Sequence, residues 1–202
     1  TRAGGEVNPD YSGTFAFTND FAALLPDTPS GGVNDGLLTA ESERGLCRVM
    51  CFSPRHDLTL PLLGVPAIES VIATWMREYA ELGSQDFINY VQIFENKGAV
   101  MGCSNPHPHG QIWCNQTIPD LPQKELETQS AYLHKHDSCL LCTYLATELL
   151  RGERIVAQND SFAVVVPFWA TWPFEVMVLP KKHMSSINEL TKAHVTDFAE
   201  IL

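Results

Sequence analysis

One short stretch of the chain alternates side chains that could carry out chemistry. Residues 107–114 read His-Pro-His-Gly-Gln-Ile-Trp-Cys. A β-strand sends alternate side chains to opposite faces, so both histidines, the glutamine and the tryptophan would share one face. A neutral imidazole beside a carboxamide suits nucleophilic attack on phosphorus, with the amide as hydrogen-bond donor. The alternative is an amphipathic edge strand whose histidines only meet water, but the paired histidines behind a Gly-Cys-Ser-Asn turn favour the chemical interpretation.

This stretch and the motifs around it resemble the active-site signature of the galactose-1-phosphate uridylyltransferase family, part of the histidine-triad superfamily. The signature extends over residues 94–98, Phe-Glu-Asn-Lys-Gly, and over residues 102–113, which open with Gly-Cys-Ser-Asn-Pro. The likeness also covers residues 8–11, 17–24, 51–54 and 166–173, so nearly the whole chain takes part.

The resemblance implies a ping-pong transfer of UMP from UDP-glucose to galactose 1-phosphate through a uridylyl-histidine intermediate. His109 would be the nucleophile, and Gln111 would donate to a phosphoryl oxygen. An imidazole with the ordinary pKa of about 6.5 is largely neutral at physiological pH, so this nucleophile needs no special activation. The family pattern assigns the diphosphate to Asn96, Gly102 and Ser104 and the nucleoside to Asn19 and Asp20, although Asn19-Asp20 can also be a plain turn.

The resemblance also implies metal ions. His56 and His107 match two zinc ligands of the family, whose Cys-x-x-Cys partner would lie N-terminal to this sequence. The alternative is that His56 only caps a strand end. Glu125 matches a carboxylate ligand of a second metal, iron or zinc, although Glu127 is close enough to leave that assignment open.

A separate Cys-x-x-Cys motif departs from the better-known members of the family. Cys139, Cys142 and, further along, His183 would supply two thiolates and an imidazole, which are three of the four ligands of a structural zinc site. The fourth would be a histidine beyond Leu202. The alternative is a pair of packed thiols and a surface histidine, because a short motif alone gives many false positives.

The elements that must position these residues follow from hydrophobic periodicity. Residues 66–82 repeat apolar side chains at helical spacing, which predicts a helix, and alternation predicts strands over 14–17, 48–52 and 90–95. An apolar run over 21–25 also indicates a strand, whereas 27–43 has no convincing pattern and is expected to be a loop. Helices are expected over 125–133 and 139–150 and after Thr191.

A weak internal repeat indicates two copies of one structural unit. Val49, His56 and a leucine at 63 recur at the same seven-residue spacing as Val176, His183 and Leu190. We therefore predict an α+β fold made of a duplicated histidine-triad-like unit, with an antiparallel sheet and packed helices, whose second copy is incomplete. The expected parts are a first half over 1–115, a connector over 116–136 and the start of the second half over 137–202, as in a fragment lacking both ends.

Composition limits the functional classes. The chain has 202 residues, 45% of them hydrophobic, and a net charge of -11, which argues against binding to nucleic acid because phosphate backbones require a basic surface. No apolar run reaches the roughly 20 residues of a membrane span. The six cysteines form no dense framework and fit a reducing compartment, so a cytoplasmic location is expected. A homodimer is expected from the resemblance.

Three other functions remain open at this stage. A nucleotide hydrolase of the same superfamily usually has a third histidine where this chain has Gln111, which argues against it because an amide cannot relay protons. A related nucleotidyl phosphorylase that uses inorganic phosphate tolerates glutamine there. A non-enzymatic nucleotide-binding module is the third alternative.

Overall fold

The structure is a computed structural model that describes residues 2, 5–103 and 105–202. The chain divides into two compact units, Thr1–Pro119 and Asp120–Leu202. Each unit has its own antiparallel sheet and its own core, and each is described separately below.

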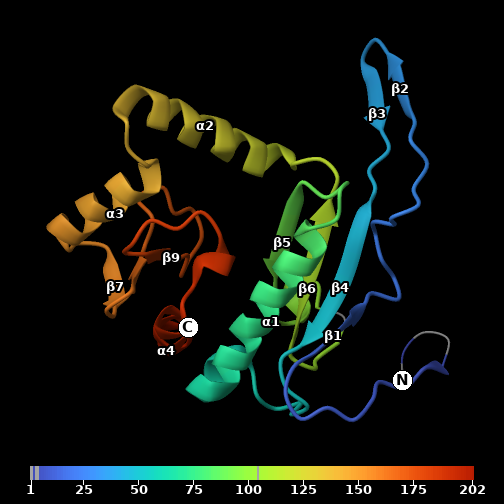
Figure 1. Ribbon diagram of the computed structural model, residues 1–202, viewed down its shortest axis with the longest axis horizontal. Helices are drawn as coiled ribbons and strands as arrows, with labels where there is room; N and C mark the ends of the chain where they lie inside the picture. Colours follow the sequence, from blue (N-terminus) through green and yellow to red (C-terminus); the bar gives the residue numbers. More distant parts are fainter. Residues whose placement is uncertain (1, 3–4, 104) are drawn as a thin grey trace. The chain divides into compact units, whose positions relative to one another are not determined.

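The first unit is built on a four-stranded antiparallel sheet with strand order β1-β4-β6-β5 (Figure 1). The central strand β6, His109–Asn115, pairs with β4 along one edge and with β5 along the other. Hydrogen bonding on both edges fixes the register of β6, so its side chains have defined faces. The other strands of this sheet are β1 (Phe15–Thr18), β4 (Gly45–Cys51) and β5 (Tyr90–Phe94).

Burial alternates along the whole length of β6. Gly110, Ile112 and Cys114 are buried, whereas His109, Gln111 and the other odd-numbered residues are only partly buried. The predicted alternation is therefore confirmed for 109–114. The strand begins at His109, so the predicted strand does not extend to His107, which lies in the bend before it.

Helix α1, Val65–Gly83, packs against the buried side of the sheet and confirms the helix predicted over 66–82. Its Leu82 forms a hydrophobic cluster with Ile88, Ile112 and Cys114. An ion pair between Arg48 of β4 and the buried carboxylate of Glu78 also ties the helix to the sheet. These contacts leave the opposite face of β6 available for chemistry.

Two predictions for the segment before β4 are wrong. Residues 21–25 form turns and bends instead of a strand, because Asn19 and Pro26 interrupt the backbone on either side of so short an apolar run. The expected loop over 27–43 contains a hairpin of β2 (Gly32–Asp35) and β3 (Leu38–Glu41) that extends away from the sheet (Figure 1). Every residue of its strands is exposed, so the hairpin leaves no buried-face alternation in the sequence.

The second unit combines helices with a three-stranded antiparallel sheet of order β7-β8-β9. Leu145 of α3 packs onto Ala163, Val165 and Leu179 of the sheet to form the core. The elements in chain order are α2 (Asp120–His136), α3 (Leu140–Arg151), β7 (Ile155–Gln158), β8 (Phe162–Val165), β9 (Met177–Pro180) and α4 (Lys192–Ile201).

The two units share features that the internal repeat predicts. His56 follows β4 and precedes α1, and His183 likewise follows β9 and precedes α4. Asn19 and Asn159 each accept a hydrogen bond from a backbone amide two residues later, at 2.9 Å and 3.3 Å. The predicted α+β class with antiparallel sheets and packed helices is confirmed. Three short 3-10 helices complete the described elements: Leu60–Leu62, Ala99–Met101 and Ile187–Glu189.

No helix within residues 2, 5–103 and 105–202 combines the length and the apolar character needed to cross a membrane.

The central position of β6 leads to a stability prediction. Ile112 is fully buried, so Ile112→Ala should lower the free energy of unfolding by about 3 kcal/mol through lost burial and a residual cavity. Urea unfolding followed by circular dichroism measures this loss. Leu37→Ala is the control, because Leu37 is 100% exposed at the hairpin turn and should change stability by less than about 0.5 kcal/mol. Equal losses in both variants would contradict the packing described here.

Candidate functional site

His107 and His109 lie between two cavities of the first unit. One cavity, of about 430 Å³, reaches Asn19 and Asp20, and the other, of about 370 Å³, reaches Asn96. Both histidines line both cavities. The structure thus brings the predicted nucleophile between the residues predicted for the nucleoside and a residue predicted for the diphosphate.

A backbone contact determines which ring nitrogen of His109 is available. Its Nδ1 lies 2.7 Å from the carbonyl oxygen of His107. A carbonyl oxygen can only accept, so Nδ1 carries the hydrogen and donates it. In the neutral ring the lone pair is then on Nε2, the arrangement that a nitrogen nucleophile requires.

Gln111 is held by its neighbour on the same face of β6. The indole Nε1 of Trp113 donates to Oε1 of Gln111 at 3.1 Å, and the Trp113 ring packs edge-on against Phe94 at 5.7 Å between centroids. Because its oxygen is engaged, the carboxamide keeps its NH₂ group for another acceptor. Gln111 can therefore act as a neutral hydrogen-bond donor beside His109.

Gly110, which separates His109 from Gln111, lies too close to neighbouring atoms for a larger residue. A Cβ at Gly110 would lie 3.1 Å from the Phe52 ring and from the carbonyl oxygen of Phe94. A larger residue at Gly110 would push β6 away from both neighbours and disturb the alignment of His109 with Gln111.

The larger cavity contains an ion pair that the sequence did not predict. Arg2 binds the carboxylate of Asp20, and its guanidinium stacks over the Phe17 ring at 4.4 Å. Asn19 uses its side-chain oxygen to accept from the backbone amide of Phe21 at 2.9 Å. Asn19 and Asp20, the two residues predicted to contact the nucleoside, both line this cavity. The plain turn that the sequence allowed as an alternative is also present.

The smaller cavity combines a carboxylate, a cation and backbone turns. Glu95 is partly buried beside Asn96, and burial raises the pKa of Glu95 although the charges of Lys97 and His109 oppose this effect. Gly102, which is not among the residues that line this cavity, ends the 3-10 helix at 99–101 with φ of +80°, a left-handed conformation that glycine accommodates without strain. Ser104, the third residue predicted for the diphosphate, lies outside the described residues.

The two histidines predicted as zinc ligands are in direct contact. Nδ1 of His56 and Nδ1 of His107 are 2.8 Å apart, and the Tyr11 hydroxyl lies 3.4 Å from Nε2 of His107. Burial, then the charges of His56 and His109, lower the pKa of His107, while a backbone hydrogen bond to Ser53 opposes them. Two adjacent imidazoles offer half of the ligands of a tetrahedral zinc site.

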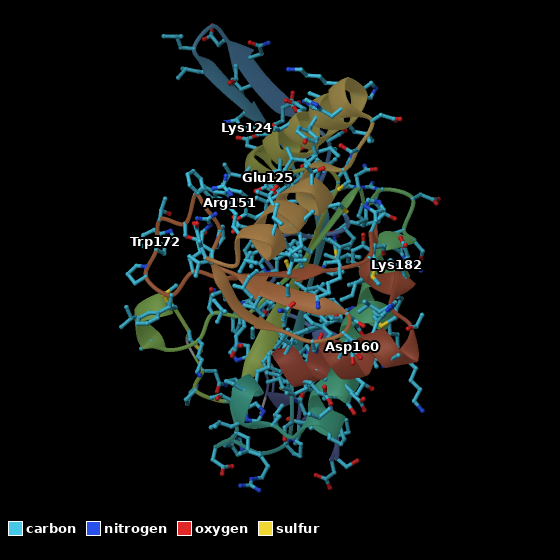
Figure 2. The ribbon with its side chains drawn as sticks, turned by 90° about the vertical axis from the view of Figure 1, so that its left-hand side faces the viewer. Lys124, Glu125, Arg151, Asp160, Trp172 and Lys182 are labelled. Atoms are coloured by element: carbon cyan, nitrogen blue, oxygen red, sulfur yellow. The ribbon has the colours of Figure 1, made fainter. Side chains whose placement is uncertain are left out.

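Glu125, the residue predicted for a second metal, belongs to the other unit. It lies near the start of α2, next to Lys124 (Figure 2). Glu125 lines a cavity of about 310 Å³ whose other walls include Leu140, Leu141 and Trp169. Among the residues described around this cavity, Glu125 alone offers a carboxylate, so the structure brings no second ligand to it.

Sequence reasoning missed three residues of the site: Arg2, Tyr11 and Glu95. Arg2 reaches the cavity from the segment before β1, far in sequence from β6, so no local spacing could indicate it. Tyr11 comes from the same segment, and burial, then Cys51, raise its pKa to about 12, so this residue is a neutral hydroxyl donor in the site. For Tyr11 and Glu95 the available signal was their place in two motifs of the family likeness, residues 8–11 and 94–98.

Comparison with known proteins gives consistent results over the whole chain. The N-terminal domain of galactose-1-phosphate uridyl transferase matches residues 1–119, and the C-terminal domain of the same family matches residues 125–202. The galactose-1-phosphate uridylyltransferase of Rattus norvegicus is 51% identical over 203 aligned residues, which cover 100% of this chain and 53% of that protein. The protein of the same name from Haemophilus influenzae is 49% identical, with 100% and 57% covered.

A solved uridylyltransferase structure also resembles this chain. It superimposes with a TM-score of 0.85 at 29% identity and covers 98% of this chain and 62% of that one. The chain spans about half the length of the curated relatives it matches.

The contact between the two histidines leads to a pH prediction. In protein stripped of metal, His56→Ala should raise the pKa of His107 toward its ordinary value, because a neighbouring positive charge is removed. The pKa should stay below that value, since burial is the larger cause. NMR titration of the imidazole ring protons measures it, with His134→Ala on α2 as the control. An unchanged or lower pKa of His107 in His56→Ala would show that His56 does not act on this ring.

Proposed function

The chain belongs to the galactose-1-phosphate uridyl transferase family, and we propose that it forms the nucleotidyl-transfer site of a UDP-glucose–hexose-1-phosphate uridylyltransferase. One observation carries the proposal. The hydrogen bond from His109 Nδ1 to the His107 carbonyl leaves the Nε2 lone pair free in a ring that lines two cavities, and Gln111 follows two residues later on the same face of β6.

In the first half-reaction, Nε2 of His109 attacks the α-phosphorus of UDP-glucose. The phosphorus–nitrogen bond forms as the bond to the bridging oxygen breaks, and glucose 1-phosphate leaves with that oxygen and its electron pair. The leaving group is a stable anion, so no strong general acid is required. The backbone carbonyl of His107 stabilises the imidazolium that forms, because it already holds the Nδ1 proton.

In the second half-reaction, a phosphate oxygen of galactose 1-phosphate attacks the uridylyl phosphorus and His109 leaves. The products are UDP-galactose and the neutral imidazole. Gln111 would donate to a non-bridging oxygen in both steps, where negative charge develops. An amide neither accepts nor relays a proton, which disfavours activation of water and supports transfer over hydrolysis.

Substrate binding is divided between the two cavities in this proposal. Asn19 and Asp20 would contact the nucleoside in the larger cavity, with Arg2 holding the Asp20 carboxylate in place. Asn96, which lines the smaller one, would hold the diphosphate. Gly102 and Ser104 are proposed for the same role from the family pattern alone. Lys97, which also lines that cavity, would offset the charge of the diphosphate in a chain that is otherwise acidic.

The proposal extends to metals and cellular context. His56 and His107 would supply two imidazole ligands to a zinc ion, and Glu125 a carboxylate ligand to a second metal, iron or zinc. A bound zinc would supply structural restraint, tying the loop after β4 to the bend before β6. All six cysteines are free thiols, which supports a cytoplasmic location, and the family relationship supports a homodimer.

The central test is the covalent intermediate. Wild-type protein incubated with UDP-glucose labelled at the α-phosphorus should retain label after denaturation at alkaline pH, because phosphorus–nitrogen bonds hydrolyse in acid. His109→Asn should retain none and should lose both half-reactions, since the nucleophile is absent. His134→Asn is the matched control and should label normally, because His134 lies on α2 and contacts only the Ser130 carbonyl among the interactions described.

Product analysis separates the proposal from its alternatives. Labelled enzyme should release its UMP group to galactose 1-phosphate much faster than to water or inorganic phosphate. Faster release to water would indicate a hydrolase, and faster release to phosphate a phosphorylase. UMP exchange by His109→Asn at a near-normal rate would rule out the mechanism.

The second test concerns Gln111, the proposed neutral hydrogen-bond donor. Gln111→Arg should reduce kcat by about two to three orders of magnitude, because a fixed charge and a larger fork replace the neutral donor fitted to the phosphoryl oxygen, and this is the scale of removing one such donor. Stopped-flow measurement of each half-reaction checks this. Trp113→Phe, which removes the hydrogen bond to the Gln111 oxygen but keeps an aromatic ring beside Phe94, should cause a smaller loss. An unchanged kcat in Gln111→Arg would remove Gln111 from the chemistry.

A further inference from the structure

The second unit contains a cluster of metal-ligating side chains that the proposed reaction does not use. Cys139, Cys142 and His183 each direct one ligand atom into a common region, and all these atoms lie within 4.8 Å of one another. Among the described residues, this is the one group of three or more histidine, cysteine or carboxylate side chains arranged in this way. It brings together a helix start and a distant loop.

Two separate elements build the cluster. Cys139 immediately precedes α3, and Cys142 lies in its first turn, so one helical turn places both thiols on the same side. His183 comes from the loop after β9, where Figure 2 labels its neighbour Lys182. Asp137, with a left-handed φ of 51°, ends α2 in a tight turn that leads directly into Cys139.

The distances match the coordination of zinc. Sγ of Cys142 lies 3.3 Å from Nδ1 of His183. Tetrahedral zinc with bonds of about 2.3 Å to sulfur and about 2.0 Å to nitrogen places such a pair roughly 3.5 Å apart. A disulfide would instead need a sulfur–sulfur distance of about 2.05 Å, and both cysteines are free thiols.

The surroundings leave room for an ion and a fourth donor. A cavity of about 490 Å³ is lined by both cysteines and His183, and the polar residues Gln129 and Asp137 also line it. The two thiols are partly buried and His183 is exposed, so an ion can enter from solvent. A water molecule or another side chain can complete a tetrahedral set.

We propose that Cys139, Cys142 and His183 bind a structural zinc ion that joins the start of α3 to the loop after β9. The ion clamps the α2–α3 turn against the exit of the sheet, beside a helix α2 that has no buried residue of its own. The site takes no part in nucleotidyl transfer. Its role is to stabilise the second unit.

The test compares metal content, spectroscopy and stability in the intact protein. Cys139→Ser/Cys142→Ser should lose about one zinc ion per chain by elemental analysis. The wild-type protein reconstituted with cobalt should show a thiolate-to-cobalt charge-transfer band that the double variant lacks or shows with reduced intensity. The midpoint of thermal unfolding should fall by about 5 °C or more, while labelling of His109 by UMP continues.

A second variant keeps the test decisive if the double variant fails to fold. His183→Ala retains both thiols and should bind zinc at least about tenfold more weakly in competition with a chromophoric chelator. His134→Ala, which alters a histidine outside the cluster, should keep wild-type affinity. Unchanged zinc content and cobalt spectrum in the cysteine variant would overturn the proposal, as would a Cys139–Cys142 disulfide in protein purified with its metal.

Discussion

The first unit depends on the placement of β6 in the middle of a four-stranded sheet. Backbone hydrogen bonds on both edges fix its register, and Ile112 and Cys114 are buried on one face. A shift by one residue would expose this apolar pair and bury His109 and Gln111 in their place. The free energy of burial under α1 is therefore what keeps an imidazole and a carboxamide on the accessible face. The same strand therefore supplies core residues on one face and the candidate site residues on the other.

The chemical orientation of the site comes mainly from backbone groups. The carbonyl of His107 determines which nitrogen of His109 carries its hydrogen, and the bend before β6 places that carbonyl there. Gln111 is oriented by Trp113 on the same strand. Such groups are part of the folded framework, so the proposed transfer would need little reorganisation when charge develops on a phosphoryl oxygen. This preorganisation fits a site that has a neutral donor in place of a general acid.

The two units use one topological position in a similar way. In each, a strand ends, a histidine follows it, and a helix comes next. In the first unit that histidine, His56, meets His107, and in the second His183 meets Cys142. Loops at strand ends can bring a side chain to a distant element without disturbing the sheet. A duplicated unit can thus keep one ligand position while the partners of that ligand differ.

The sequence by itself determined the elements with a buried face and the local motif of the site. The helical period of α1 and the alternation of β6 indicate burial directly, because the apolar residues that recur at these spacings, such as Val71, Ile72 and Ile112, face the core. The hairpin over 32–41 has no buried face, so its sequence shows no such alternation. The run over 21–25 led to a wrong prediction because apolar content alone does not determine backbone conformation.

Only the tertiary structure showed that Arg2 meets Asp20, and only it supplied the geometry of two contacts that motif resemblance had suggested, His56 with His107 and Cys142 with His183. Their separations of 18, 51 and 41 residues exceed any helical or strand period. Such contacts arise from the packing of whole elements, and local sequence cannot encode them because they depend on where each element ends in space.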